Sequence, residues 1–203
     1  MISYTDLKKE IIVICDRIIQ IEEELTDIDS KLGDGDMGIS MSKGAQAVKN
    51  VAQMEEEKNL KELLLTCAQA LNKAAPSTMG TILASSLIAL ARYVANKNVL
   101  TQEELVAVPG ILAEAIIKRG KARVGDKTIL DALVPYAETI LGVYTKTKNM
   151  ENAKGQALRA AVQGMESTKG MIAKTGRASW LGDRNKEYPD AGAYMFCRIV
   201  EIL

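Results

Sequence analysis

The sequence predicts an all-α fold, with residues 1–203 forming a single domain. Apolar residues recur at steps of three and four through most of the chain, which is the period of one buried helix face. No stretch shows the strict alternation of a half-buried strand between turn signals. With 47% hydrophobic and 26% charged residues, the 203-residue chain also has the composition of a globular protein with a sizeable core.

Periodicity and capping signals together predict eight helices. In the first, apolar residues recur from Leu7 to Leu25 between charged ones, and a polar loop is expected over residues 26–38. In the fifth, Thr101 and Glu104 have the spacing of a capping box, and Pro109 with the following glycine predicts a kink or break. The seven helices expected after the first cover residues 38–53, 60–73, 77–96, 101–119, 129–145, 152–169 and 191–203.

The composition excludes several function classes. Lys and Arg number 26, as do Asp and Glu, and a net charge of zero argues against a protein that binds nucleic acid through bulk positive charge. No apolar run is long enough to span a bilayer and the N-terminus lacks a signal-peptide pattern, so we expect a cytoplasmic protein with no membrane contact. Cys15, Cys67 and Cys197 lie far apart in apolar stretches and are predicted to be reduced core residues.

The chain contains no histidine. This absence removes imidazole metal ligands, Ser-His-Asp and Cys-His nucleophile pairs, and phosphohistidine chemistry within the chain. Any chemistry must therefore use carboxylates, hydroxyls, lysine, arginine, backbone groups and bound ions.

The first polar loop concentrates carboxylates. Asp27, Asp29, Asp34 and Asp36 lie within ten residues and repel one another unless a cation lies among them. The spacing does not fit an EF-hand, whereas Mg²⁺ needs only a few carboxylates beside water and phosphate oxygens. The following helix N-terminus at 38–40 favours an anion. Spacing alone supports a magnesium-bridged phosphate and a solvated, helix-capping acidic loop equally.

Three further polar loops, 73–81, 118–128 and 174–192, also lie at helix junctions. The hydroxyl groups of loop 73–81 either hold a phosphate or cap a helix, and the residues alone favour the cap. The five basic residues of the second form a solvated turn or a site for an anionic ligand or acidic partner. In the third, an arginine clamps a nucleotide phosphate or, equally, pairs with Asp183 and holds the loop together.

In their order and spacing, these loops resemble those of one family. The chain resembles the nucleotide-binding L subunit of dihydroxyacetone kinase over nearly its whole length. That resemblance implies a barrel of eight antiparallel helices with the ligand site at one end. It rests on Gly33-Asp34-Gly35-Asp36-x-Gly38, Arg119-Gly120-Lys121-Ala122-x-x-Gly125-Asp126-Lys127-Thr128 and Gly176-Arg177-Ala178-Ser179-x-Leu181-Gly182-x-Arg184.

The resemblance also implies a site. Asp29, Asp34 and Asp36 match three aspartates that hold a pair of Mg²⁺ ions on the phosphates of ADP or ATP. Arg177 matches a phosphate contact and is the predicted catalytic residue; Gly120 and Ile129 match positions around the adenine. The full set of expected nucleotide-binding residues is Met37, Gly38, Ile39, Ser40, Ala74, Ala75, Ser77, Thr78, Gly120, Ile129, Arg177, Asp190, Ala191 and Gly192.

The implied activity is phosphoryl transfer to a small ketose, dihydroxyacetone or a similar compound, held covalently on a histidine of a separate K-type subunit. The donor is ATP, or a permanently bound ADP is rephosphorylated by a phosphohistidine carrier of the sugar phosphotransferase system; the sequence does not separate these. A homodimer is a further association that the sequence leaves open.

Two positions depart from the family pattern. Met37 stands where the family usually has a histidine, and a thioether donates no hydrogen bond to phosphate. Residues 74–78, Ala-Ala-Pro-Ser-Thr, replace a Gly-Gly-x-Ser-Gly stretch, and larger side chains there would alter the approach of the backbone to the nucleotide. They motivate two alternatives: a non-catalytic, nucleotide-sensing regulatory subunit, and a helical protein with a vestigial site.

Overall fold

The computed structural model describes residues 1–54, 59–176, 178–180, 182 and 186–203. Within them the protein is all-α, as predicted, and its β-type pairing is limited to an isolated bridge between Ile2 and Leu100. None of the described helices is long and apolar enough to cross a membrane. The helices are α1 Tyr4–Gln20, α2 Glu22–Leu32, α3 Met37–Gln53, α4 Leu60–Ala74, α5 Thr78–Tyr93, α6 Gln102–Gly120, α7 Leu130–Thr147, α8 Met150–Ser167 and α9 Ala191–Val200.

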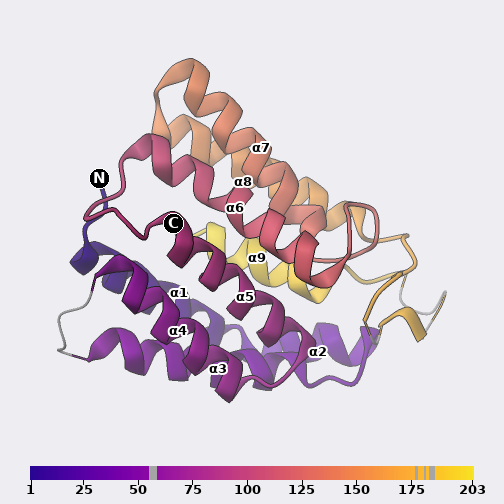
Figure 1. Ribbon diagram of the computed structural model, residues 1–203. Coiled ribbons are helices and arrows are strands. Elements are labelled where there is room, and N and C mark those ends of the chain that lie inside the picture. Colours follow the sequence, from indigo (N-terminus) through magenta and orange to yellow (C-terminus); the bar gives the residue numbers. More distant parts are fainter. Residues whose placement is uncertain (55–58, 177, 181, 183–185) are drawn as a thin grey trace.

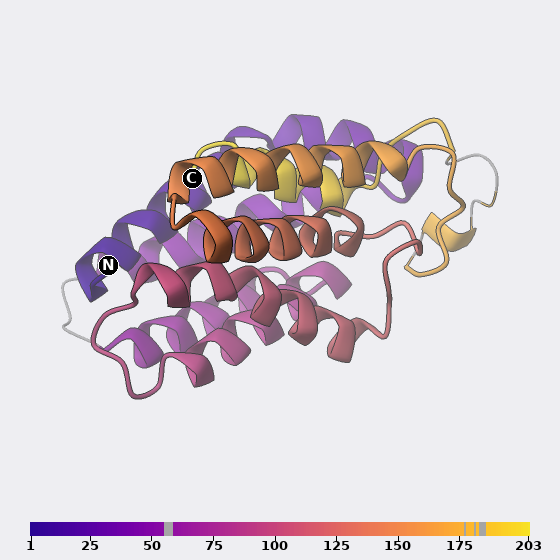
Figure 2. The same cartoon turned by 90° about the horizontal axis from the view of Figure 1, so that it is seen from above.

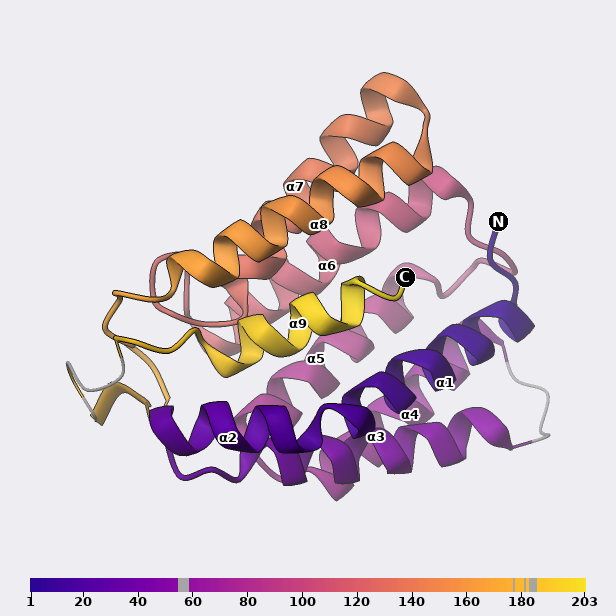
Figure 3. The same ribbon diagram turned by 180° about the vertical axis from the view of Figure 1, so that it is seen from behind.

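The helices form a closed bundle (Figures 1 and 3). From α3 to α8 each helix packs against the next one in the chain, α1 packs against α3, and α9 contacts α1 and α2 on one side and α7 and α8 on the other. Because neighbouring helices run in opposite directions, the connections alternate between the two ends of the bundle. The α2–α3, α4–α5, α6–α7 and α8–α9 connections all lie at one end, opposite the chain termini (Figure 3).

The predicted first helix is divided in two. The chain turns at Ile21, whose side chain is fully buried and whose φ of −96° and ψ of 15° interrupt the helix. The prediction of a polar loop from residue 26 was wrong for its first half, because α2 continues to Leu32. Leu25 and Leu32 are buried and continue the apolar face, while Asp27, Ser30 and Lys31 between them are exposed. The loop therefore begins only at Gly33.

The structure confirms the predicted capping box and the buried cysteines but not the break at Pro109. The capping box at Thr101 is confirmed: its hydroxyl accepts from the Glu104 amide at 3.2 Å, and the Glu104 carboxylate accepts from the Thr101 amide at 2.8 Å. Pro109 causes no break, because α6 runs uninterrupted from Gln102 to Gly120. Cys15, Cys67 and Cys197 are all buried thiols, as predicted.

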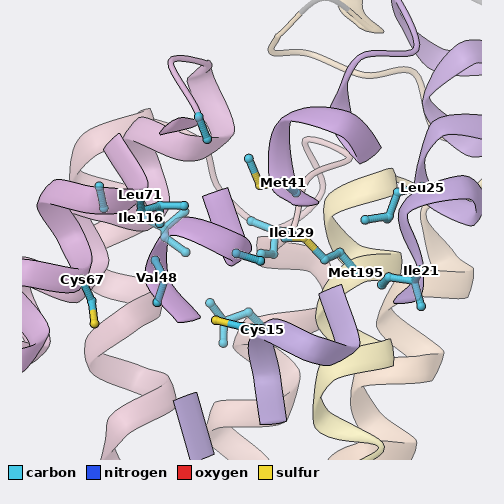
Figure 4. Packing of buried hydrophobic residues seen from close by; sticks show 14 of the residues in the cluster. Cys15, Ile21, Leu25, Met41, Val48, Cys67, Leu71, Ile116, Ile129 and Met195 are labelled. Carbon is cyan, nitrogen blue, oxygen red and sulfur yellow. The ribbon is translucent and has the colours of Figure 1, made fainter. Parts of the chain in front are cut away.

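The core reaches the end of the bundle where the four connections meet. Figure 4 shows this part of it, in which Ile21 and Leu25 from the first two helices, Met41 from α3, Ile129 and Met195 belong to one apolar cluster. Residues that flank the site are thus packed into the same core as the helices that carry them, which limits their movement.

Small residues allow α7 and α8 to pack closely (Figures 2 and 3). Ala153, Ala157 and Ala161 recur every four residues along α8 and are completely buried. Gly164 continues this stripe: a methyl group there would lie 2.0 Å from the carbonyl oxygen of Asp131 in α7. The backbone of α7 therefore occupies the place of a side chain.

Gly164→Ala should destabilise the protein by about 1–3 kcal/mol, because the new methyl group meets backbone atoms that cannot move without separating two helices. Gly155→Ala is the matched control in the same helix. Nothing lies within 4 Å of its added methyl group, so the change should be neutral or stabilise by up to about 1 kcal/mol through helix propensity. Urea unfolding monitored by circular dichroism measures both; equal effects would show that the α7–α8 contact is not as tight as described.

Candidate functional site

A pocket of about 290 Å³ opens at the end of the bundle where the four connections meet. Each of the four connections contributes to its wall, so the pocket depends on the closure of the bundle. Its lining residues are Asp29, Leu32, Asp34, Asp36, Met37, Ser77, Thr78, Met79, Ile82, Ile116, Gly120, Ala122, Lys127, Thr128, Ile129, Leu130, Thr175, Gly176, Ala178, Asp190, Ala191 and Gly192.

Three carboxylates stand together at this pocket. Oxygen atoms of Asp29, Asp34 and Asp36 lie within 4.8 Å of one another, and within the described residues no other group of three acidic side chains is so arranged. Asp34 and Asp36 are exposed and Asp29 is partly buried. Like charges this close repel, and a hard divalent cation that prefers oxygen ligands would relieve the repulsion. The donor set fits Mg²⁺.

The helical termini fix where these carboxylates lie. Asp29 belongs to the last turn of α2, and its Oδ2 accepts a hydrogen bond from the backbone amide of Met37, the first residue of α3, at 3.0 Å. Between them Gly35 adopts a φ of +73°, which allows the chain to reverse over few residues. Asp27 lies outside the group and pairs with Lys31 at 2.5 Å.

The residues that open α3 serve helix packing more than the pocket. At Gly38 a methyl group would lie 2.2 Å from both the carbonyl oxygen of Glu22 and the hydroxyl of Thr26, so glycine lets α3 start directly against α2. Ile39 is 45% exposed, and the Ser40 hydroxyl bonds to the Ser77 hydroxyl at 3.3 Å. Of the four residues expected here, Met37 alone lines the pocket.

The α4–α5 turn brings hydroxyl groups to the pocket. Ser77 caps α5 by accepting from the Gly80 amide at 3.1 Å, and Ser77 and Thr78 both line the pocket. Ala75 is completely buried, and its methyl group lies 3.1 Å from where a methyl group on Gly44 would be. Its side chain is therefore part of the core, and neither it nor Ala74 is among the lining residues.

The α6–α7 loop is held by carboxylates that accept backbone hydrogen bonds. Asp131, which is 1% exposed, accepts from the amides of Gly125 at 2.6 Å and Thr128 at 2.7 Å. Asp126 accepts from the Arg123 amide at 2.9 Å, and this bond, with one from the Lys174 ammonium, lowers the pKa of Asp126. The long motif of this loop thus has a structural role that the sequence did not reveal, and Gly120 and Ile129, which are predicted to lie around the adenine, line the pocket.

The connection before α9 supplies the last wall. Asp190, Ala191 and Gly192 line the pocket, and a methyl group on Gly192 would lie 2.8 Å from the Met79 methyl group and 3.2 Å from Cβ of Ile129. Three helices therefore meet closely at this glycine. Arg177, the predicted catalytic residue, lies outside the described residues, as do Asp183 and Arg184.

Sequence reasoning missed the apolar wall of the pocket. Met79 and Ile82 from α5, Ile116 from α6 and Leu130 from α7 all line it. All four lie in stretches predicted to be helical, and periodicity alone does not separate a pocket wall at a helix end from a core face. The available signal was proximity: each lies within about one helical turn of a predicted loop.

Asp190 combines a cap with an unusual environment. Its Oδ1 accepts from the Ala193 amide at 2.8 Å, and its own amide donates to the Thr168 hydroxyl at 2.8 Å. Burial raises the pKa of Asp190 to about 7 from its ordinary value of 3.8, although the amide bonds and the nearby Lys127 act in the opposite direction. The stabilisation from protonated Asp190 is therefore complete below pH 3.8 and is lost as the pH rises through about 7.

Asp190→Asn should remove this pH dependence while keeping the helix cap, since asparagine offers the same acceptor. Between pH 5 and 7.5, the wild type should lose about 1–3 kcal/mol of unfolding free energy relative to the variant. Urea titrations at several pH values measure the difference. Asp126→Asn is the control: the pKa of Asp126 is lowered, so its difference from wild type should stay flat over this range. A flat difference for Asp190→Asn would contradict the raised pKa.

Comparisons with known proteins match both the sequence and the fold. The family model of the DAK2 domain matches residues 31–203. The chain is 30% identical over 190 residues to the PEP-dependent dihydroxyacetone kinase, ADP-binding subunit DhaL, of Escherichia coli, covering 93% of this chain and 90% of the relative. It is 32% identical over 186 residues to the L-erythrulose 1-kinase of Mycolicibacterium smegmatis, covering 90% of this chain and 32% of that enzyme.

A solved structure, the dihydroxyacetone kinase of C. freundii in its native form, aligns with a TM-score of 0.75 at 20% identity over 96% of this chain and 33% of that one. The same kinase in complex with AMP-PNP and Mg²⁺ aligns with a TM-score of 0.72. These likenesses show that the fold is shared, and the chain spans about a third of that longer enzyme. The chain belongs to the DAK2-domain family as an L-type member, a component of a kinase-like phosphotransferase.

Proposed function

We propose that residues 1–203 act as one domain that holds ADP or ATP with Mg²⁺ and passes a phosphoryl group to a small ketose on a separate K-type subunit. The observation that carries this proposal is the group formed by Asp29, Asp34 and Asp36 at the rim of a pocket with an apolar wall. Metal-binding oxygens beside an apolar cavity suit a ligand with a charged end and a flat, apolar end.

Each part of the pocket has a role in this proposal. The three aspartates supply ligands for a pair of Mg²⁺ ions, which when bound neutralise charge on the phosphates of the nucleotide. Ser77 and Thr78 offer hydroxyl groups to the phosphates. Ile82, Ile116 and Ile129 offer apolar contacts to the base. Arg177 remains the residue that we predict to contact the phosphoryl group during its transfer.

The absence of histidine assigns the remaining chemistry to partners. Without an imidazole, the chain offers neither a histidine base for the acceptor hydroxyl nor a phosphohistidine of its own. The acceptor would therefore be prepared on the K-type subunit. If the donor is a phosphohistidine, it comes from a carrier protein, and two relatives support this: the subunits named PEP-dependent in E. coli and PTS-dependent in Lactococcus lactis. Relatives named for dihydroxyacetone and for erythrulose leave the ketose itself open.

A regulatory subunit that senses nucleotide without transferring phosphoryl groups is the second candidate. Met37 favours it, because the residue lines the pocket and donates no hydrogen bond from its side chain. This candidate predicts that the protein binds magnesium and nucleotide but supports no transfer with any K-type subunit.

The first experiment is a thermal shift of the purified protein with Mg²⁺, with ADP or ATP, and with both, after mass spectrometry for retained nucleotide. Binding raises the midpoint by mass action, so a magnesium-dependent shift is expected. Retained ADP would favour the phosphohistidine carrier as donor, and rapid exchange with ATP would favour ATP. No retained nucleotide and no shift would contradict the proposal.

Asp34→Asn and Asp36→Asn should each weaken magnesium-dependent ADP binding by at least about tenfold. Even the loss of a residue that only hydrogen-bonds to a metal ligand lowers metal affinity by about that factor. Both variants should stay folded, because the side chains are exposed and asparagine has the same shape as aspartate. Isothermal titration calorimetry in Mg²⁺ measures the affinity. Asp27→Asn, an exposed aspartate of α2 outside the group, should bind like wild type. Unchanged affinity in Asp34→Asn or Asp36→Asn would overturn the metal assignment.

Met37→His should be tolerated and should not weaken nucleotide binding, because the change restores the residue usual in the family at a half-buried position of the pocket wall. The imidazole adds a hydrogen-bond donor beside the proposed phosphate position. Calorimetry with ADP and Mg²⁺ again gives the affinity. A large loss would mean that the pocket is built differently from that of its relatives.

A further inference from the structure

Lys127 has a surprising position for a lysine. It lies in the α6–α7 loop with 2% of its surface exposed and a φ of +59°, a backbone conformation that side-chain-bearing residues rarely adopt. Burial disfavours its charged form and lowers its pKa, while the nearby Asp190 opposes that effect. Both the strain and the burial cost free energy, so contacts made by this side chain must offset them.

Those contacts join two distant points of the chain. The Lys127 ammonium donates to the carbonyl oxygen of Tyr188 at 2.8 Å and to that of Met171 at 3.4 Å. Met171 follows the end of α8, and Tyr188 precedes the start of α9. One ammonium group thus holds both ends of the connection between these helices against the α6–α7 loop.

Other bonds also hold this connection, among them the one from the Asp190 amide to the hydroxyl of the fully buried Thr168 at 2.8 Å. The Gly170 amide donates to the Lys186 carbonyl at 2.7 Å, and the Lys174 amide donates to the Asp126 carbonyl at 3.1 Å. The Lys31 ammonium lies 5.0 Å from the ring centroid of Tyr188. Within the described residues these bonds start from exposed side chains or from backbone, whereas Lys127 is the buried cation among them.

The anchored chain forms two parts of the pocket wall. Thr175, Gly176 and Ala178 follow Met171 and line the pocket, and Asp190 follows Tyr188 and lines it as well. If both ends moved away from the α6–α7 loop, these residues would leave their places together. Polar contacts to a ligand depend on such positions to within a fraction of an ångström.

We propose that Lys127 is a positioning residue, which preorganises the ligand pocket by holding the chain at Met171 and Tyr188. The proposal rests on the proposed function for the identity of the ligand, but the anchoring itself does not. Lys127 lines the pocket, yet its two described bonds are made to backbone carbonyls. A direct bond to a phosphate is therefore the competing role.

The test compares three full-length variants. Lys127→Met removes the ammonium, Lys127→Arg keeps a charged donor, and Lys121→Met is the control. Lys121 lies in the same loop with a similar φ of +55° but is exposed, so it matches the loss of a lysine at a strained position without the anchor. Hydrogen exchange of the Gly170 and Lys174 amides, measured by NMR without nucleotide, reports on the anchored chain; calorimetry with ADP and Mg²⁺ reports on the pocket.

Lys127→Met should speed exchange at both amides by about tenfold or more and weaken ADP binding by a similar factor, since two charge-assisted bonds are lost. Lys127→Arg should recover most of both effects, and Lys121→Met should show neither. Weaker binding with unchanged amide exchange would overturn the proposal in favour of a direct phosphate contact. Unchanged exchange and unchanged binding would overturn it as well.

Two further results keep the test decisive. If Lys127→Met does not fold, Lys127→Gln replaces it: its side chain is neutral and one atom shorter, so it makes no charge-assisted bond, and it should show the same pattern with smaller amplitude. If the wild type binds no ADP in Mg²⁺, the proposed function fails, while the amide exchange of the variants still decides whether Lys127 anchors the chain.

Discussion

The mutual repulsion of three carboxylates is the constraint around which this end of the bundle is built. Oxygens of Asp29, Asp34 and Asp36 lie within 4.8 Å of one another, and like charges this close repel, so the fold must hold these side chains together. It does so through the α2–α3 junction, where Gly38 lets two helices touch and the Met37 amide bonds to Asp29. A cation bound among the three carboxylates would add attraction to each of them and so would stabilise the folded protein by mass action.

Much of this architecture is readable in the sequence, and the errors have a physical cause. Periodicity identified most of the helices. The spacing of four aspartates left a magnesium site and a capping loop equally open, and the family resemblance singled out Asp29, Asp34 and Asp36. The prediction of helices failed between residues 26 and 32, where the many polar residues suggested a loop although Leu25 and Leu32 continue the apolar face. Close approaches such as the one at Gly164 are invisible in one sequence, because the neighbouring backbone comes from another helix.

The basic residues of the α6–α7 loop show the same limit at the site. In the sequence the five form one charged run, which indicates either solvent or an anionic ligand. In the structure Lys118, Arg119, Lys121 and Arg123 are exposed, whereas Lys127 is buried and bonds to backbone carbonyls. Burial distinguishes Lys127 from the other four basic residues of the loop, and only the tertiary structure determines burial.

Both departures from the family pattern reach the pocket. In the α4–α5 turn, Ala75 is fully buried beside Gly44 and takes no space from the pocket, whereas Thr78, which stands where the family has a glycine, lines it. Met37 lines the pocket, next to the carboxylates, where a side-chain donor is lost. The choice between a transferring and a sensing subunit therefore depends on what Met37 and Thr78 do to the bound phosphates. A loss of transfer that Met37→His restores would trace the difference to a single hydrogen-bond donor.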